Sequence, residues 1–235
     1  MLKAVFFDLD GTLLPMDQDE FMKAYFSSLS RKMALIGYDP KLLIKSVWHG
    51  SEAMINNDGS QSNEQVFWEA FNLSYGKNAR ADEDYFNTYY VEDFDMVAEV
   101  CKINPAVISV ISTIKNMGLR LALATNPLFP SIATEKRVAW TGLDISDFEI
   151  VTTYENSRFC KPNLKYYQDI LQSMGLEPEE VLMVGNDVSD DMVVSELGMK
   201  VFLITDYLIN KDNKKIDVYP NGTFEDLAKH IKTLI

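Results

Sequence analysis

The strongest constraint on the fold is the alternation of apolar, strand-like runs with helical segments after Gly118. Parallel strands need long crossovers, usually helices, so this order predicts an α/β fold in which helices cover both faces of a parallel sheet. The run at 119–124 is apolar at all but one position, which suits a strand buried on both sides. The predicted strands are 3–7, 119–124, 149–152, 181–184 and 200–204; the predicted helices are 105–117, 131–141, 163–174, 189–197 and a last one that begins at Thr223.

The segment between the first two predicted strands has a different pattern. It contains no strand-like run, and helical patterns appear at 20–36, 41–48, 64–73 and 83–91, with a polar break at 56–63. We therefore predict a core domain formed by residues 1–15 and 98–235, and an all-helical domain, residues 16–97, inserted after the first strand. Trp48, Trp68 and Phe71 occur at helical spacings, which favours packing inside this insert over a ligand-stacking role.

Charge and cysteine content narrow the range of partners. The chain has 22 basic and 35 acidic residues and a net charge of −13, which disfavours nucleic acids and anionic membranes as partners. Cys101 and Cys160 are too few for a disulfide framework and are expected to be free thiols. No signal-like segment is present, nor the run of roughly 18 apolar residues that a membrane helix needs. These observations predict a cytoplasmic protein.

Polar side chains suited to phosphate and metal chemistry follow the predicted strands. In open parallel sheets, ligands bind at the carboxyl ends of the strands, so residues that follow different strands can meet in one pocket. The candidates are Asp8 and Asp10 after the first strand, Thr125 and Asn126 after the second, Asp187, Asp190 and Asp191 after the strand at 181–184, and Lys161 just before a helix.

Asp8 and Asp10 form the most informative pair. Side chains at i and i+2 of an extended segment point the same way, so both carboxylates can face one pocket. A hard divalent cation would relieve their repulsion and still leave room for phosphate oxygens. One carboxylate can attack phosphorus to form an acyl phosphate, while the other protonates the leaving alkoxide and then activates water. Gly11 allows a tight turn, and Thr12 offers a hydroxyl or a cap.

Each feature also has a simpler explanation when it is taken alone. The segment 8–12 suits a solvated turn, and Thr125 suits packing or capping. Lys161 suits an exposed lysine, and the acidic residues at 187–191 suit capping of a helix and its dipole. Their joint appearance in this order favours a site in which Thr125 and Lys161 bind a phosphoryl group.

With these motifs in this order, the sequence resembles the haloacid dehalogenase superfamily of phosphohydrolases. The motifs correspond to Asp8-Leu9-Asp10-Gly11-Thr12, Thr125, Lys161 and the segment 185–191, and the insert resembles the type 1 helical cap of that family. The resemblance implies a Rossmann-like core, with Asp8 as nucleophile and Asp10 as acid/base. It also implies a Mg²⁺ ion bound by Asp8, the Asp10 backbone carbonyl and an acidic residue of the last motif. The implied substrate-binding residues are Thr12, Thr125, Asn126 and Lys161.

The last motif departs from the usual family pattern, because Asn186 follows Gly185 where an aspartate is expected. In one register, Asp187 binds the metal and Asp191 supports the lysine or metal-bound waters. In the other, Asn186 takes the first place and Asp190 the second. We favour Asp187 with Asp191, because a carboxylate suits a hard cation better than an amide does.

Taken together, these features predict an enzyme, a Mg²⁺-dependent hydrolase of phosphoric monoesters that forms an aspartyl-phosphate on Asp8. The expected substrate is a small phosphorylated metabolite, because a cap would close over the pocket, and the expected assembly is a monomer or small homo-oligomer. A phosphomutase of the β-phosphoglucomutase type and a non-catalytic binding protein are the alternatives. The intact Asp8, Asp10, Thr125 and Lys161 argue against the second. A receiver-like signalling domain would give no reason for Asp10 or for the insert.

Overall fold

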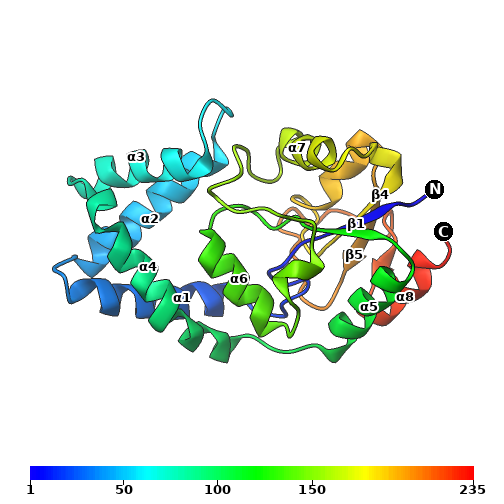
Figure 1. The fold of residues 1–235 in the computed structure, drawn as a ribbon, viewed down its shortest axis with the longest axis horizontal. Helices are drawn as coiled ribbons and strands as arrows, with labels where there is room; N and C mark the ends of the chain where they lie inside the picture. Colours follow the sequence, from blue (N-terminus) through cyan, green and yellow to red (C-terminus); the bar gives the residue numbers. More distant parts are fainter.

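In the computed structural model, which describes residues 1–235, a six-stranded parallel sheet lies at the centre of the α/β part (Figure 1). The strand order is β3-β2-β1-β4-β5-β6. The strands are β1 (Ala4–Phe7), β2 (Arg120–Leu123), β3 (Ile150–Val151), β4 (Val181–Gly185), β5 (Lys200–Ile204) and β6 (Asn221–Gly222). Phe7 pairs with Leu123 of β2 on one side and with Val184 of β4 on the other. The carboxyl end of β1 therefore lies where the strand order reverses, which is where such sheets bind ligands.

Helices cover both faces of this sheet because successive residues of each strand point to opposite faces. Val5 and Phe7 of β1 belong to an apolar cluster shared with α5 (Pro105–Asn116) and α8 (Phe224–Ile231). Phe6 belongs to a second cluster, shared with α7 (Leu164–Met174). Every residue of β1 is buried. The sheet and its two helical layers confirm the predicted Rossmann-like α/β fold.

The chain between β1 and β2 forms helices and no strand, and these helices lie beside the sheet in Figure 1. They are α1 (Gln18–Ala34), α2 (Pro40–Ile55), α3 (Asn63–Tyr75), α4 (Glu83–Glu92) and the 3₁₀ helices η1 (Ala79–Asp82) and η2 (Phe94–Val100). One apolar cluster includes Phe7 of the sheet together with Phe21, Phe71 and Phe94 of the insert. Packed side chains connect the two regions. The division of the chain into a core domain and an inserted domain of residues 16–97 therefore stays a proposal.

The polar break at 56–63 attaches the insert to the α/β core. The backbone N–H groups of Asn63 and Glu64 donate to the carbonyls of Ser157 and Tyr154. The buried Asn63 amide lies 3.3 Å from Sγ of Cys160 and 3.4 Å from the carbonyl of Pro127. These contacts position the insert over the carboxyl edge of the sheet.

Several local features differ from the sequence-based expectations. α2 continues to Ile55 instead of ending near 48, because Gly50 is an interior helix residue: a Cβ there would lie 2.5 Å from the Phe67 ring. Trp48 is 52% exposed, so its interpretation as a packed residue of the insert was wrong, whereas Trp68 and Phe71 are buried.

The remaining differences lie in the second half of the chain. The segment 189–197 becomes helical only at Met192, as the 3₁₀ helix η5 (Met192–Leu197), because residues 187–190 form a turn. The two-residue strand β6 was not predicted. Both cysteines are free. No helix of the structure combines the length and apolar character needed to cross a bilayer.

Candidate active site

The floor of the candidate site is an ion-paired triad of Asp8, Lys161 and Asp191. Nζ of Lys161 lies 2.8 Å from Oδ1 of Asp8 and 2.6 Å from Oδ1 of Asp191. Burial disfavours the ammonium form of Lys161, but the adjacent carboxylates of Asp191 and Asp8 outweigh this effect and raise the lysine pKa well above its ordinary value. The triad joins residues that follow β1 and β4 with one that immediately precedes Pro162 and α7, as expected when strand ends converge.

Thr12 connects Asp8 to the loop after β4. Its hydroxyl lies 3.0 Å from Oδ2 of Asp8 and 3.0 Å from Oδ1 of Asn186. A hydroxyl has one hydrogen to share between these two acceptors, so the two oxygens retain capacity to bind a cation. Gly11 has a φ of +81°, and a Cβ there would lie 2.2 Å from the Asn186 amide. Glycine therefore allows both the turn and the approach of Asn186.

Asp10 does not belong to the triad and is paired with Arg137. Arg137 was not among the predicted site residues. Arg137, in α6 (Ser131–Trp140), is fully buried; its guanidinium donates to Oδ2 of Asp10 and lies 4.3 Å from the centre of the Phe129 ring. Oδ1 of Asp10 is buried and has no hydrogen-bond partner. Burial raises the pKa of Asp10, while the charge of Arg137 opposes this effect. Asp10 thus has one fixed oxygen and one free oxygen, as an acid/base needs.

Arg137 could have been suspected from helix spacing alone. It follows Ala133 by four residues and precedes Val138, so it lies on the buried face of α6. A buried guanidinium requires a partner such as a carboxylate. The same spacing does not reveal which carboxylate, because Asp10 is 127 positions away in sequence.

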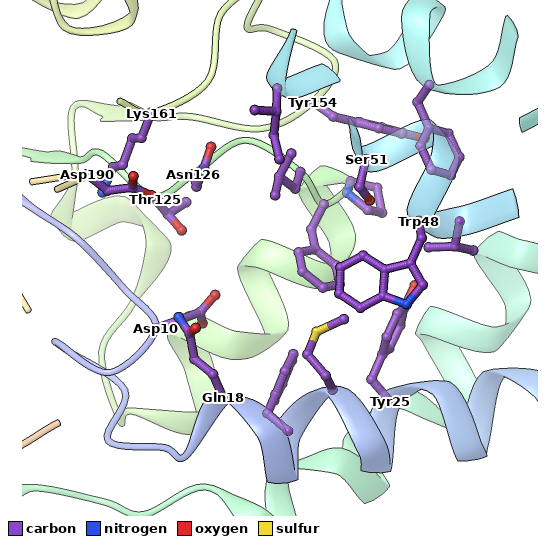
Figure 2. Close-up of a pocket in the computed structure, with 18 of the residues that line it drawn as sticks. Asp10, Gln18, Tyr25, Trp48, Ser51, Thr125, Asn126, Tyr154, Lys161 and Asp190 are labelled. Carbon is purple, nitrogen blue, oxygen red and sulfur yellow. The ribbon is translucent and has the colours of Figure 1, made fainter. Parts of the chain in front are cut away.

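The residues after β2 form the next part of the wall. Thr125 is buried at the cavity, and its backbone carbonyl accepts hydrogen bonds from the hydroxyls of Thr152 and Tyr166. Oδ1 of Asn126 is buried without a partner. Figure 2 shows Thr125, Asn126, Lys161 and Asp190 together on one side of the pocket. The structure therefore brings the two predicted phosphate-binding positions next to the lysine.

The loop after β4 uses its acidic residues in different ways. Oδ1 of Asp187 accepts hydrogen bonds from the backbone N–H groups of Ser189 and Asp190, and Oδ2 of Asp191 accepts one from the N–H of Asp187. Burial, and next the charge of Asp187, raise the pKa of Asp190. Asp187 and Asp190 line the cavity, but it is Asn186 that shares Thr12 with Asp8. In this loop Asn186 contacts Thr12, and Asp191 contacts Lys161.

The charges around the cavity are suited to a divalent cation. Five aspartates line it, at positions 8, 10, 187, 190 and 191, together with the lysines Lys161 and Lys211. No group of three or more His, Cys, Asp or Glu side chains is arranged to hold a metal ion. The available oxygens come instead from Asp8, the Asn186 amide and the Asp10 carbonyl, which accepts no backbone hydrogen bond. Such a donor set suits Mg²⁺, which prefers few protein ligands and retains waters.

Above this floor lies a cavity of about 460 Å³, closed on its far side by the helical insert. Tyr25, Trp48 and Ser51 lie across the pocket from Thr125 and Lys161 (Figure 2). The cavity is large enough for a small organic molecule and places such a ligand directly over the carboxylates.

Solved structures with the same fold include two that match over nearly the whole chain. One is the haloacid dehalogenase (HAD) phosphatase from Thermococcus onnurineus, with a TM-score of 0.62, 19% identity and 98% coverage of both chains. The other is the 2-haloacid dehalogenase from Pseudomonas syringae, with a TM-score of 0.63, 16% identity and full coverage of both chains. At these identities the likeness establishes the fold alone.

Sequence relatives agree with this fold. The glyceraldehyde 3-phosphate phosphatase of Methanothermobacter thermautotrophicus is 26% identical over 228 residues, which cover 92% of each chain. A model of the haloacid dehalogenase-like hydrolases matches residues 2–193. These matches confirm the predicted family and the prediction of an enzyme, a hydrolase of the phosphatase class. The chain therefore belongs to the haloacid dehalogenase-like hydrolase family.

Proposed function

We propose that this chain hydrolyses a small phosphomonoester with the help of Mg²⁺ and forms an aspartyl-phosphate on Asp8. The observation that carries the proposal is the setting of Asp8 at the floor of the cavity. One of its oxygens lies 2.8 Å from Nζ of Lys161 and the other lies 3.0 Å from the Thr12 hydroxyl. These contacts orient the carboxylate, and Lys161 can also neutralise charge on an incoming phosphoryl group.

The reaction would proceed in two displacements. In the first, an oxygen of Asp8 attacks phosphorus, the bond from phosphorus to the ester oxygen breaks, and Asp10 donates a proton to the leaving alkoxide. In the second, Asp10 takes a proton from a water molecule that attacks the phosphoryl group, and the bond to Asp8 breaks to release phosphate. The free Oδ1 of Asp10 and the burial that raises its pKa support this dual role.

The proposed metal would be held by Asp8, the Asp10 backbone carbonyl and a side-chain oxygen of the loop after β4. The carboxylate of Asp187 is the ligand favoured by charge, and the amide of Asn186 is the one that shares Thr12 with Asp8. When bound, Mg²⁺ would offset the negative charge of the aspartates and of the phosphate. Asp191, which holds Lys161, and Asp190 would act as supporting residues.

Small phosphorylated metabolites are the expected substrates. The name of the relative from Methanothermobacter thermautotrophicus, a glyceraldehyde 3-phosphate phosphatase, supports this size class. The cavity of about 460 Å³ supports it too, because the insert forms one wall of it and would exclude large esters. We keep the predicted cytoplasmic location and the monomer or small homo-oligomer as parts of this proposal.

The test is phosphate release from a panel of phosphomonoesters with Mg²⁺ and with EDTA. We expect metal-dependent release that Asp8→Asn and Asp10→Asn both abolish, while Asp217→Asn, at an exposed position outside the cavity, leaves it unchanged. Mass spectrometry of the protein after a brief reaction should detect a phosphate on Asp8. Turnover by Asp8→Asn would refute the nucleophile. Conversion of one sugar phosphate isomer into another without phosphate release would favour the phosphomutase alternative.

A further inference from the structure

The part of the cavity that would hold the alcohol portion of the substrate is apolar. The helical insert contributes a series of aromatic and aliphatic side chains to its wall, and the loop after β2 adds Leu128 and Phe129. Trp48 and Ile55 keep 52% and 46% of their surfaces exposed, although both are large apolar side chains. Exposed apolar surface of this kind, gathered around one cavity over a catalytic floor, is typical of a ligand site.

This wall provides no positive charge. The insert contains seven lysines and arginines between residues 16 and 97, and none of them lines the cavity. Lys32, for example, pairs with Glu92 and Asp93, and Arg31 contacts Met96. Glu52 is the charged residue that the insert contributes to the wall, and it forms no ion pair. A second anionic group on the substrate would therefore meet a carboxylate and an apolar surface.

The two lysines that line the cavity belong to the core and not to the insert. Lys161 is held between Asp8 and Asp191, and Lys211 contributes positive charge near Asp190. Apart from Glu52, the polar groups on the insert side are neutral: the hydroxyls of Tyr25 and Tyr90 lie 2.9 Å apart and share one hydrogen bond, and Ser51 faces the pocket in Figure 2. They can donate a hydrogen bond to a hydroxyl or ether oxygen of the substrate but cannot neutralise a charge.

We infer that the substrate is the phosphate ester of an uncharged alcohol that carries an apolar, ring-sized group, seated against Trp48. This inference rests on the proposed phosphomonoester hydrolysis and specifies its substrate class. A three-carbon sugar phosphate such as glyceraldehyde 3-phosphate would leave the apolar wall uncovered. A substrate with a carboxylate or a second phosphate would place an unpaired charge beside Glu52.

Matched esters test this inference without changing the chemistry of the leaving group. Ethyl phosphate, 2-phenylethyl phosphate and 2-carboxyethyl phosphate are all esters of primary alcohols, and they differ in carrying no group, an apolar ring or a carboxylate. We expect kcat/KM to be roughly tenfold or more higher for 2-phenylethyl phosphate than for ethyl phosphate, since apolar pocket contacts give factors of this size. We expect 2-carboxyethyl phosphate to fall below ethyl phosphate.

The possible outcomes separate the two proposals. A higher kcat/KM for 2-carboxyethyl phosphate or glyceraldehyde 3-phosphate than for 2-phenylethyl phosphate would overturn the substrate class and leave phosphomonoester hydrolysis intact. Equal values for the ethyl and phenylethyl esters would do the same. Absence of release from all four esters, under conditions where the protein is folded, would remove the proposed function and this inference with it.

Two substitutions and one control test whether the insert determines the preference for an uncharged, apolar alcohol group. Trp48→Ala should reduce the ratio of kcat/KM for the phenylethyl and ethyl esters roughly tenfold. Tyr85→Ala, which removes another half-exposed aromatic side chain of the insert that lies outside the cavity, should leave this ratio unchanged. Glu52→Lys should raise kcat/KM for 2-carboxyethyl phosphate relative to ethyl phosphate, and this solvent-exposed change avoids disturbing the core. An unchanged ratio in Trp48→Ala, or no gain in Glu52→Lys, would contradict the inference.

Discussion

The triad of Asp8, Lys161 and Asp191 should be essential for stability as well as for turnover. The exposed fractions of the three side chains are 11%, 2% and 1%, and both ion-pair distances are below 3 Å. Lys161→Met keeps most of the side-chain volume but removes the cation, and leaves two buried carboxylates close together. Removing one partner of a buried ion pair costs about 3–5 kcal/mol, so we expect the free energy of unfolding to fall by about that amount.

Urea unfolding and thermal melting measure this loss. For a chain of this length, a fall of about 3–5 kcal/mol corresponds to a decrease in Tm of roughly 6–20 °C. The loss should be greatest near pH 7.5 and smaller near pH 5.5. In the folded variant, repulsion between the two carboxylates favours proton uptake, whereas in the unfolded chain the carboxylates stay ionised in this pH range. The folded variant therefore binds more protons than the unfolded chain and gains stability as the pH falls. EDTA in all samples prevents a divalent cation from replacing the lysine.

A matched control separates the triad from a general effect of losing one lysine. Lys23 lies on the exposed face of α1 and forms no ion pair, so Lys23→Met should change the free energy of unfolding by no more than about 0.5 kcal/mol. Equal urea midpoints for Lys161→Met and Lys23→Met at both pH values would refute the reasoning, because they would mean that the buried carboxylates do not need the lysine.

Three further predictions concern the proposed acid/base, the metal position and the attachment of the insert. Arg137→Met removes the positive charge that opposes the raised pKa of Asp10. The limb of the pH–rate profile that belongs to Asp10 should therefore move upward by about one pH unit or more. An unmoved limb would contradict the proposed effect of Arg137 on Asp10. Asn186→Ala should weaken activation by Mg²⁺ about tenfold or more, and a larger loss in Asp187→Ala would assign the metal position to Asp187. Asn63→Ala should lower stability by about 1–3 kcal/mol and speed amide exchange in residues 56–63; unchanged exchange would show that Asn63 does not fasten the insert.

The sheet could be predicted because its central strands are buried on both faces. Burial on both sides requires apolar residues at consecutive positions, as in β1, where all four residues are buried. β6 contains only Asn221 and Gly222, which carry no such signal, and pairs with β5 through backbone groups. The end of α2 was missed for a different reason, since the close contact of Gly50 inside this helix depends on Phe67 from α3.

The convergence of the site was predictable for a geometric reason. Residues after β1, β2 and β4 must meet because these strands are neighbours with the same direction. Which side chain of the loop after β4 reaches Thr12 was harder to predict. That reach is decided by the turn at Asp187, where a carboxylate oxygen binds two backbone N–H groups of its own loop. A turn of this kind uses part of the Asp187 carboxylate locally and leaves Asn186 facing Asp8.

Arg137 shows why the electrostatics of Asp10, the proposed acid/base, could not be obtained from the motifs alone. An acid/base must give up a proton in one step and take one in the next, so its pKa has to lie within reach of the working pH. Burial alone would push the pKa of Asp10 upward and hinder the proton donation of the first displacement. The guanidinium of Arg137 opposes that rise, and it comes from α6, outside the four motifs. The motif supplies the carboxylate, whereas a helix between the insert and the sheet adjusts its proton affinity, and only the folded chain brings the two together.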